Sequence, residues 1–197
     1  MRRGLFINIP YNTVAAIDEN FIEAFNISDR IVLDGSLTTK ENILTEIDNI
    51  ILKSRYGDEI ILYMSCRCDN FKNQILTYDQ KNITSQELEE KIFKNRNITI
   101  TIIIDCFNLN SLFKLPYKYI TPDQYIEISS FTLGRKILFL SSYSLQHGLL
   151  TQLLLDCKNK EKTKWHEIID DISRKCSLKN VICATSTLQQ LDNIVIF

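Results

Sequence analysis

Short apolar runs rich in β-branched residues alternate with helical patterns along most of this chain. The runs occupy residues 4–9, 29–35, 58–65, 98–105, 136–142 and 192–197. Between them, apolar residues recur at the helical spacing of three and four in segments 13–26, 37–57, 84–95, 145–157 and 163–176. Strands that alternate with helices form a mostly parallel sheet, and strands that are apolar throughout indicate helices on both of its faces. The sequence therefore predicts an α/β fold with one central, mostly parallel sheet of about six strands.

Charge and composition exclude several classes of partner. The net charge is -1 and no cluster of lysine and arginine stands out, so we expect no nucleic-acid partner and no anionic membrane. The apolar part of "MRRGLFINIPYN" is too short for a signal peptide or a membrane span. The six cysteines show no paired framework, which indicates reduced thiols in a cytoplasmic protein.

Two of the predicted strands end in unusual residues. "LYMSCRCD" (62–69) and "IIIDCFNLN" (102–110) each place cysteines and polar groups directly after an apolar run. The helical segment between them predicts neighbouring parallel strands. Open α/β sheets bind ligands beyond the carboxyl ends of their strands, and a cysteine–histidine pair can be assembled from two such ends. We therefore expect the functional site where the two strand ends meet.

The same two stretches resemble the motifs of metacaspases, which are caspase-like cysteine peptidases. That family carries Ser-Gly-His-Gly after one strand, then Asp-Ser-Cys-His-Ser-Gly after a later strand, followed by Leu-Pro-Tyr. Here "GDEIILYMSCRC" (57–68) is similar to the first motif, and "TIIIDCFNLNSLFKLPYKY" (101–119) matches the second in spacing. The resemblance spans nearly the whole chain. It implies a single caspase-like three-layer domain over 1–197, with a larger-subunit-like part at about 1–118 and a smaller-subunit-like part at about 135–197.

The chain departs from the family at both catalytic positions. Arg67 stands where the family has its histidine base, and Phe107 stands where it has its cysteine nucleophile. Arginine keeps its proton and cannot act as a general base, and phenylalanine offers no nucleophile. The resemblance therefore implies a catalytically inactive homologue that binds a protein or peptide partner, such as an active caspase-like relative. We expect Arg67 to pair with Asp105 or Asp69 where the catalytic pair stood.

Some binding residues of the family are retained. Ser65 and Asp105, with Asp79 as a weaker match, correspond to positions that line the family's pocket for basic residues, so a remnant pocket for lysine or arginine is implied. The stretch "CDNFKNQILTYDQ" holds two carboxylates where the family has an acidic, calcium-binding loop. Two are too few for a cation that takes about six oxygen ligands, so no metal cofactor is expected. Because the segment before the first predicted strand is short, we expect no prodomain.

Two alternatives remain open from the residues. One is an active endopeptidase that cleaves after basic residues with a displaced nucleophile, which is Cys106 or else Cys66 or Cys68, and with His147 as its base. However, a shift of one residue along a strand turns a side chain to the other face, which favours Cys106 as a buried apolar residue. The other alternative is a soft-metal or redox site formed by Cys66, Cys68 and Cys106, although C-x-C without a second pair is a weak signal.

Overall fold

A computed structural model describes the chain at residues 1–10, 19–69, 72, 74–94, 98–107, 112–113, 115, 117–121, 124–127, 136–142, 148–175, 181–185 and 195–197. Its helices are α1 (Glu19–Ala24), α2 (Lys40–Lys53), α3 (Ser85–Ile92), α4 (Leu149–Asn159) and α5 (Trp165–Lys175), with a 3-10 turn at Gly35–Leu37. Its strands are β1 (Arg2–Asn8), β2 (Asp29–Asp34), β3 (Glu59–Asp69), β4 (Gln74–Leu76), β5 (Asn82–Ile83), β6 (Thr99–Phe107), β7 (Tyr117–Thr121), β8 (Gln124–Glu127), β9 (Lys136–Ser142) and β10 (Val181–Thr185).

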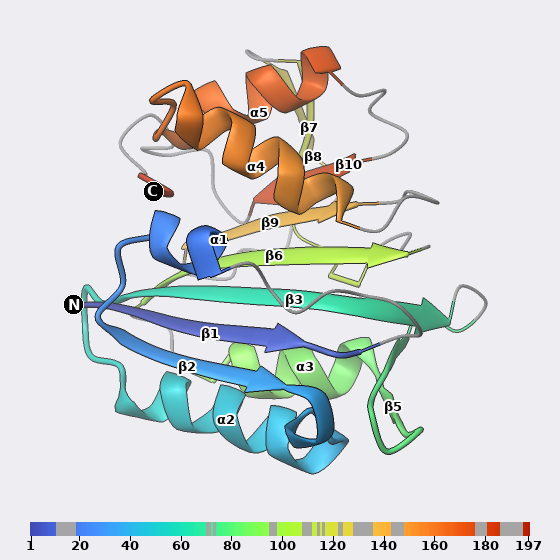
Figure 1. Ribbon diagram of the computed structural model, residues 1–197. Coiled ribbons are helices and arrows are strands. Elements are labelled where there is room, and N and C mark those ends of the chain that lie inside the picture. The colour runs from blue at the N-terminus through green and yellow to red at the C-terminus, as the bar shows by residue number, and fades with distance from the viewer. Residues whose placement is uncertain are drawn as a thin grey trace.

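The strands form one mixed sheet of ten strands within the described residues (Figure 1). The order is β2-β1-β3-β6-β9-β10-β7-β8, and β4 and β5 extend from the end of β3. The five strands from β2 to β9 are parallel, whereas the pairings of β10, β7, β8, β4 and β5 are antiparallel. The expected parallel core is therefore present, but the expectation of a mostly parallel sheet is wrong. The difference arises because the weakly patterned segments after β3 and β6 add antiparallel strands, and β10 adds another after α5.

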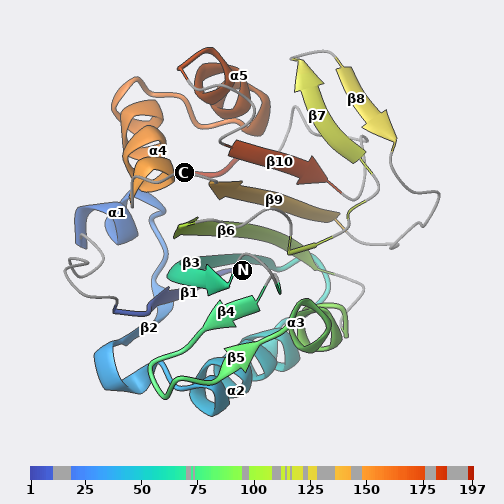
Figure 2. The same ribbon diagram turned by 90° about the vertical axis from the view of Figure 1, so that its right-hand side faces the viewer.

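Helices cover both faces of the sheet (Figure 1, Figure 2). Alternate residues of the central strands enter two separate cores. Ile60, Leu62 and Met64 of β3 pack with α2 and α3, whereas Ile61 and Tyr63 pack with α1, α4 and α5. Strands that are buried on both faces require apolar residues throughout, which is the pattern seen in the sequence. The predicted arrangement of three layers is confirmed.

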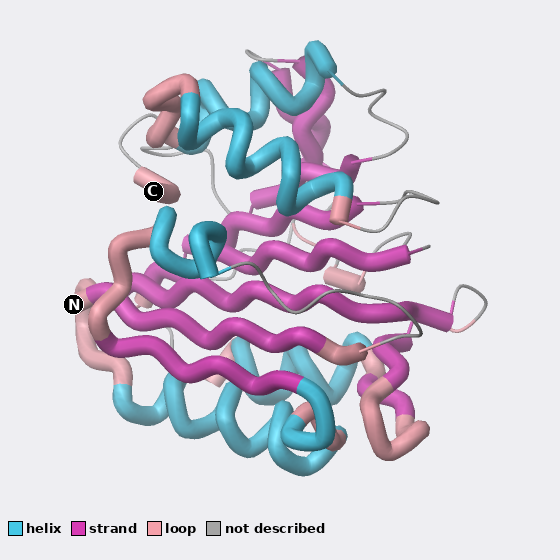
Figure 3. The backbone as a smooth tube through the Cα atoms, viewed as in Figure 1, coloured by secondary structure: helices cyan, strands magenta, loops and turns pink. Residues whose placement is uncertain are grey.

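Local sequence signals fix where two of the helices begin. Thr84 and Glu87 form a complete capping box at the start of α3, with each side chain bonded to the other's backbone N–H. Helix α2 begins at Lys40, and its N-cap residue is Thr39, whose side chain accepts from the Asn42 N–H. Gly35–Leu37 form a separate 3-10 turn ahead of the helix, visible in the backbone trace (Figure 3).

The end of the chain differs from the sequence prediction. Residues 192–197 were expected to form a strand, but Val195 makes only an isolated bridge to Lys164, and residues 192–194 lie outside the described part. Ile196 and Phe197 are buried in the core beside α4 and α5. The added antiparallel strand is instead β10, which the sequence analysis did not predict. None of the described helices is long and apolar enough to cross a membrane.

Candidate functional site

The ends of β3 and β6 lie side by side, as the sequence predicts. The parallel register pairs Ser65 with Asp105 and continues to Phe107, the last residue of β6. Arg67 is therefore directly opposite Phe107. The two positions that resemble the family's base and nucleophile positions are thus neighbours across one strand pair. The described structure of Phe107 is limited to its backbone.

Asp105 faces the layer of α4 and has 1% of its surface exposed. Its carboxylate accepts hydrogen bonds from the backbone N–H of Thr151 at 2.8 Å and from the Thr151 hydroxyl at 2.6 Å. Thr151 is the third residue of α4, and the N-cap residue Gly148 makes no side-chain cap bond. The first N–H groups of a helix have no partner within the helix, and a negative charge there is favourable. Asp105 therefore caps α4 from the neighbouring strand.

The hydroxyl of Tyr63 extends this network to the adjacent strand. It lies 2.6 Å from the Thr151 hydroxyl, and its ring is buried between the sheet and the helix layer. Burial, with the nearby Asp105 carboxylate, raises the pKa of Tyr63 above its ordinary value. Sequence analysis missed both Tyr63 and Thr151. The available signal was Gly148, which begins a helix without a capping side chain of its own.

The three residues expected to line a pocket for basic side chains have different surroundings. Ser65 and Asp105 are adjacent and buried. Asp79 lies at the start of α2, where it accepts from the backbone N–H of Lys40 at 3.0 Å and from the Thr77 hydroxyl at 2.6 Å. The hydrogen bond from the Thr77 hydroxyl has the largest effect on the pKa of Asp79, and the bond from the Lys40 N–H has the next largest. Together they lower that pKa to about 2. The carboxylate of Asp105 thus caps the start of α4, and the carboxylate of Asp79 caps the start of α2.

A pocket of about 440 Å³ opens at the carboxyl end of β1 and β3. Arg67 is the one charged residue among those that line it, and it is partly buried. The other lining residues come from the end of β1 and from β4 and the turn after it: Ile9, Pro10, Leu76, Thr77, Tyr78 and Gln80. The pocket therefore combines apolar and neutral polar walls with a single cation. Its position matches the strand-end location that the sequence predicts. The expected partner of Arg67 stays a prediction.

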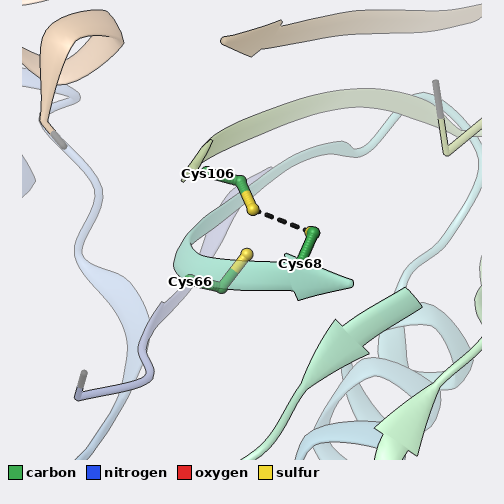
Figure 4. Close-up of side chains that lie close together, drawn as sticks. All are labelled: Cys66, Cys68 and Cys106. Atoms are coloured by element: carbon green, nitrogen blue, oxygen red, sulfur yellow. Dashed lines mark hydrogen bonds between the residues drawn. The ribbon is translucent and has the colours of Figure 1, made fainter. Parts of the chain in front are cut away.

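Three cysteines lie together at the same strand ends, on the face of the sheet that α2 and α3 cover (Figure 4). Asp105 lies on the opposite face, toward α4. Cys66 is paired in register with Cys106, and Cys68 is the next residue of β3 on that face. The three sulfurs lie within 4.8 Å of one another, and the Cys106 and Cys68 sulfurs are 2.7 Å apart. The exposed fractions are 1%, 4% and 2% for Cys66, Cys68 and Cys106. The prediction that Cys106 is a buried residue is confirmed, while its expected base, His147, lies outside the described residues.

The thiols perturb one another. Hydrogen bonding of the Cys66 thiol to Cys106 and Cys68, together with burial, raises the pKa of Cys66. Burial likewise raises the pKa of Cys106. The thiols of Cys106 and Cys66 donate to the Cys68 sulfur, which lowers the pKa of Cys68 to about 5.

Comparisons with known proteins establish the fold of the chain, but they identify no activity. No family model matches the chain, and no curated protein matches it. The crystal structure of protein GSU0716 from Geobacter sulfurreducens is similar, with a TM-score of 0.64 and 12% sequence identity. The match covers 94% of this chain and 93% of that one. At this identity the likeness establishes a shared mixed α/β fold, and the site must be interpreted from its own residues.

Proposed function

We propose that this chain is a non-catalytic relative of the caspase-like cysteine peptidases and acts as a binding or regulatory protein. The observation that carries the proposal is the direct pairing of Arg67 with Phe107 at the ends of β3 and β6. In the family these positions hold the base and the nucleophile, which must lie close together to react. Here the paired positions offer a permanently protonated guanidinium and a phenyl ring.

The nearest thiol does not replace the missing nucleophile. Cys106 precedes Phe107 by one residue, and its side chain enters the core formed with α2 and α3. Asp105, on the other side, faces α4. A nucleophile must reach its substrate, and burial raises the pKa of Cys106, which disfavours the reactive thiolate. These features support a role without peptide-bond cleavage.

The pocket beside Arg67 supports binding of a peptide segment. It lies at the carboxyl ends of β1 and β3, and its described walls combine apolar and neutral polar side chains with the Arg67 side chain. Asp105, on which the expected binding of lysine or arginine depends, is buried and bonded to Thr151. Among the described residues that line the pocket, none is acidic.

A cleavage assay tests the loss of catalysis. Purified protein is incubated with fluorogenic peptides that end in arginine or lysine, with and without calcium. We expect no cleavage above the blank. Cleavage that disappears in Cys106→Ala or Cys68→Ala would overturn the proposal, because it would identify a displaced nucleophile. The double variant Arg67→His/Phe107→Cys is the matched positive test, and we expect its new thiol to react faster with iodoacetamide than the thiols of the unmodified chain.

A binding assay tests the pocket separately. Fluorescence polarisation compares short peptides that carry glutamate, lysine or neutral residues at one position. We expect peptide binding that weakens in Arg67→Ala, which alters the pocket wall, and is kept in Arg30→Ala, an exposed arginine on β2. Absence of binding, or equal affinity in both variants, would contradict the assignment of this pocket.

A further inference from the structure

The cysteine cluster of Cys66, Cys68 and Cys106 has no role in the proposed binding function. It lies on the α2 and α3 side of the sheet, whereas Asp105 and its network lie on the α4 side. Among the described residues, these three cysteines are the one group of three or more potential metal ligands whose ligand atoms lie close together. Two of its members come from alternate positions of one strand, and the third is directly opposite on the next strand. Regular strand geometry thus places three thiols on one small patch.

The spacing of the sulfurs suits a single metal ion. A metal–sulfur bond of about 2.3 Å places three sulfurs of a planar site about 4.0 Å apart. The three sulfurs here already lie within 4.8 Å of one another, so coordination requires the Cys68 and Cys106 sulfurs to separate from 2.7 Å by about 1.3 Å. Side-chain rotation at the ends of two strands provides movements of this size. Figure 4 shows the three side chains directed into the same space.

The ligand set favours a soft ion that accepts three ligands. Thiolates select copper(I), zinc and iron–sulfur clusters. Zinc in structural sites takes four ligands, and within the described residues no histidine, carboxylate or further cysteine joins the three sulfurs. Exposed fractions of 1–4% leave little access for a water molecule as a fourth ligand. We propose that Cys66, Cys68 and Cys106 form a three-coordinate binding site for one copper(I) ion.

A disulfide accounts for this arrangement less well. Cys68 lies two residues beyond the position that pairs with Cys106. With a rise of about 3.3 Å per residue and a strand spacing of about 4.8 Å, regular strands place these Cα atoms about 8 Å apart. Disulfides require Cα atoms within about 7 Å. A bond between Cys66 and Cys106 satisfies this limit but leaves Cys68 unused, whereas a metal ion engages all three sulfurs.

Binding exchanges protons for the ion and moves no electrons. One copper(I) ion forms three copper–sulfur bonds, and each sulfur that carries a proton before binding releases it to solvent. The product carries a net charge of −2 in a buried place. Because protons leave when the ion binds, the affinity is expected to rise with pH.

A competition titration tests the site. Reduced full-length protein is titrated anaerobically with copper(I) against the chromophoric chelator bicinchoninate. We expect one ion per chain to be withdrawn from the chelator. Cys66→Ala, Cys68→Ala and Cys106→Ala should each weaken binding by more than the roughly 10–100-fold that loss of an outer-shell partner costs. Alanine is chosen because a buried serine would add an unsatisfied hydroxyl.

Cys157→Ala is the matched control, since Cys157 is a buried thiol of α4 on the other face of the sheet. It should retain the ion, and circular dichroism verifies the fold of every variant. X-ray absorption at the copper edge of the loaded wild-type protein needs no variant, and we expect three sulfur neighbours at about 2.3 Å. Any of four results would overturn the proposal. They are two sulfur neighbours at the copper, equal binding by all four variants, no withdrawal of copper(I) from the chelator, and tighter binding of zinc(II) than of copper(I).

Discussion

The contact between Asp105 and Thr151 is expected to hold α4 onto the sheet, and Asp105→Ala removes it. One carboxylate oxygen accepts from two donors of Thr151, the N–H at 2.8 Å and the hydroxyl at 2.6 Å. Hydrogen bonds to a charged group contribute about 1.5–3 kcal/mol each. Alanine leaves both donors without this acceptor, while it also removes the cost of burying a carboxylate. We expect a net loss of roughly 2–4 kcal/mol in the free energy of unfolding.

Urea unfolding followed by circular dichroism measures this loss. In a chain of this length each kcal/mol lowers the melting temperature by roughly 2–4 °C, so a fall of roughly 4–16 °C should accompany it. Asp105→Asn keeps one acceptor oxygen and should lose about half as much. Asp29→Ala is the control, because this aspartate is largely exposed and pairs with Arg3 on the surface, where such pairs contribute about 0–1 kcal/mol.

The outcome distinguishes two roles for Asp105. If Asp105→Ala costs no more than Asp29→Ala, the capping argument is refuted, and Asp105 returns to the ligand-binding role implied by the family resemblance. A large loss of stability, with peptide binding unchanged in Asp105→Asn, would instead support a structural role. The slope of the unfolding curve against urea should stay constant, since the cap changes stability and not the extent of the surface exposed on unfolding.

Two further substitutions test the helix start at Asp79 and the packing at Gly4. Because the pKa of Asp79 is lowered to about 2, its stabilising contribution is present above its unfolded value of about 3.9 and is lost as pH falls to 2. Asp79→Asn should thus be less stable than wild type at pH 7, with the difference in urea midpoint vanishing between pH 4 and 2. Gly4→Ala places a Cβ 2.6 Å from Phe6 Cε2 and should cost about 1–3 kcal/mol by urea unfolding; an unchanged midpoint would contradict this packing.

The parallel core of the sheet was predictable because its strands are apolar on both faces. The centres of these strands, residues 5–7 in β1, 60–64 in β3 and 102–104 in β6, are continuously apolar, and both faces are buried by helices. The helix between β3 and β6 correctly indicated that these strands are neighbours. The direct pairing of Arg67 with Phe107 follows from this adjacency, although the sequence alone leaves the register undetermined.

The antiparallel strands were not predictable from the same signal. Strands β4 and β5 have three and two residues, too few to display a period. β10 (Val181–Thr185) and residues 192–197 have similar apolar patterns, yet β10 joins the sheet, whereas the described residues 195–197 lie outside it. Ile196 and Phe197 instead fill the core beside α5, so tertiary packing decides between two runs of equal local preference. The cap of α4 likewise depends on a residue far away in the sequence.

The side chains of successive residues of β6 lie on opposite faces of the sheet. This alternation separates the hydrogen bonds of Asp105 from the cysteine cluster. Asp105 points toward α4, Cys106 points toward the core of α2 and α3, and the alternation follows from the two-residue period of a strand. A substitution at Cys106 should therefore alter copper(I) binding without disturbing the hydrogen bonds at Thr151. Conversely, Asp105→Asn should lower stability without changing the number of copper(I) ions bound. If either variant changed both properties to a similar extent, the two faces would not act independently.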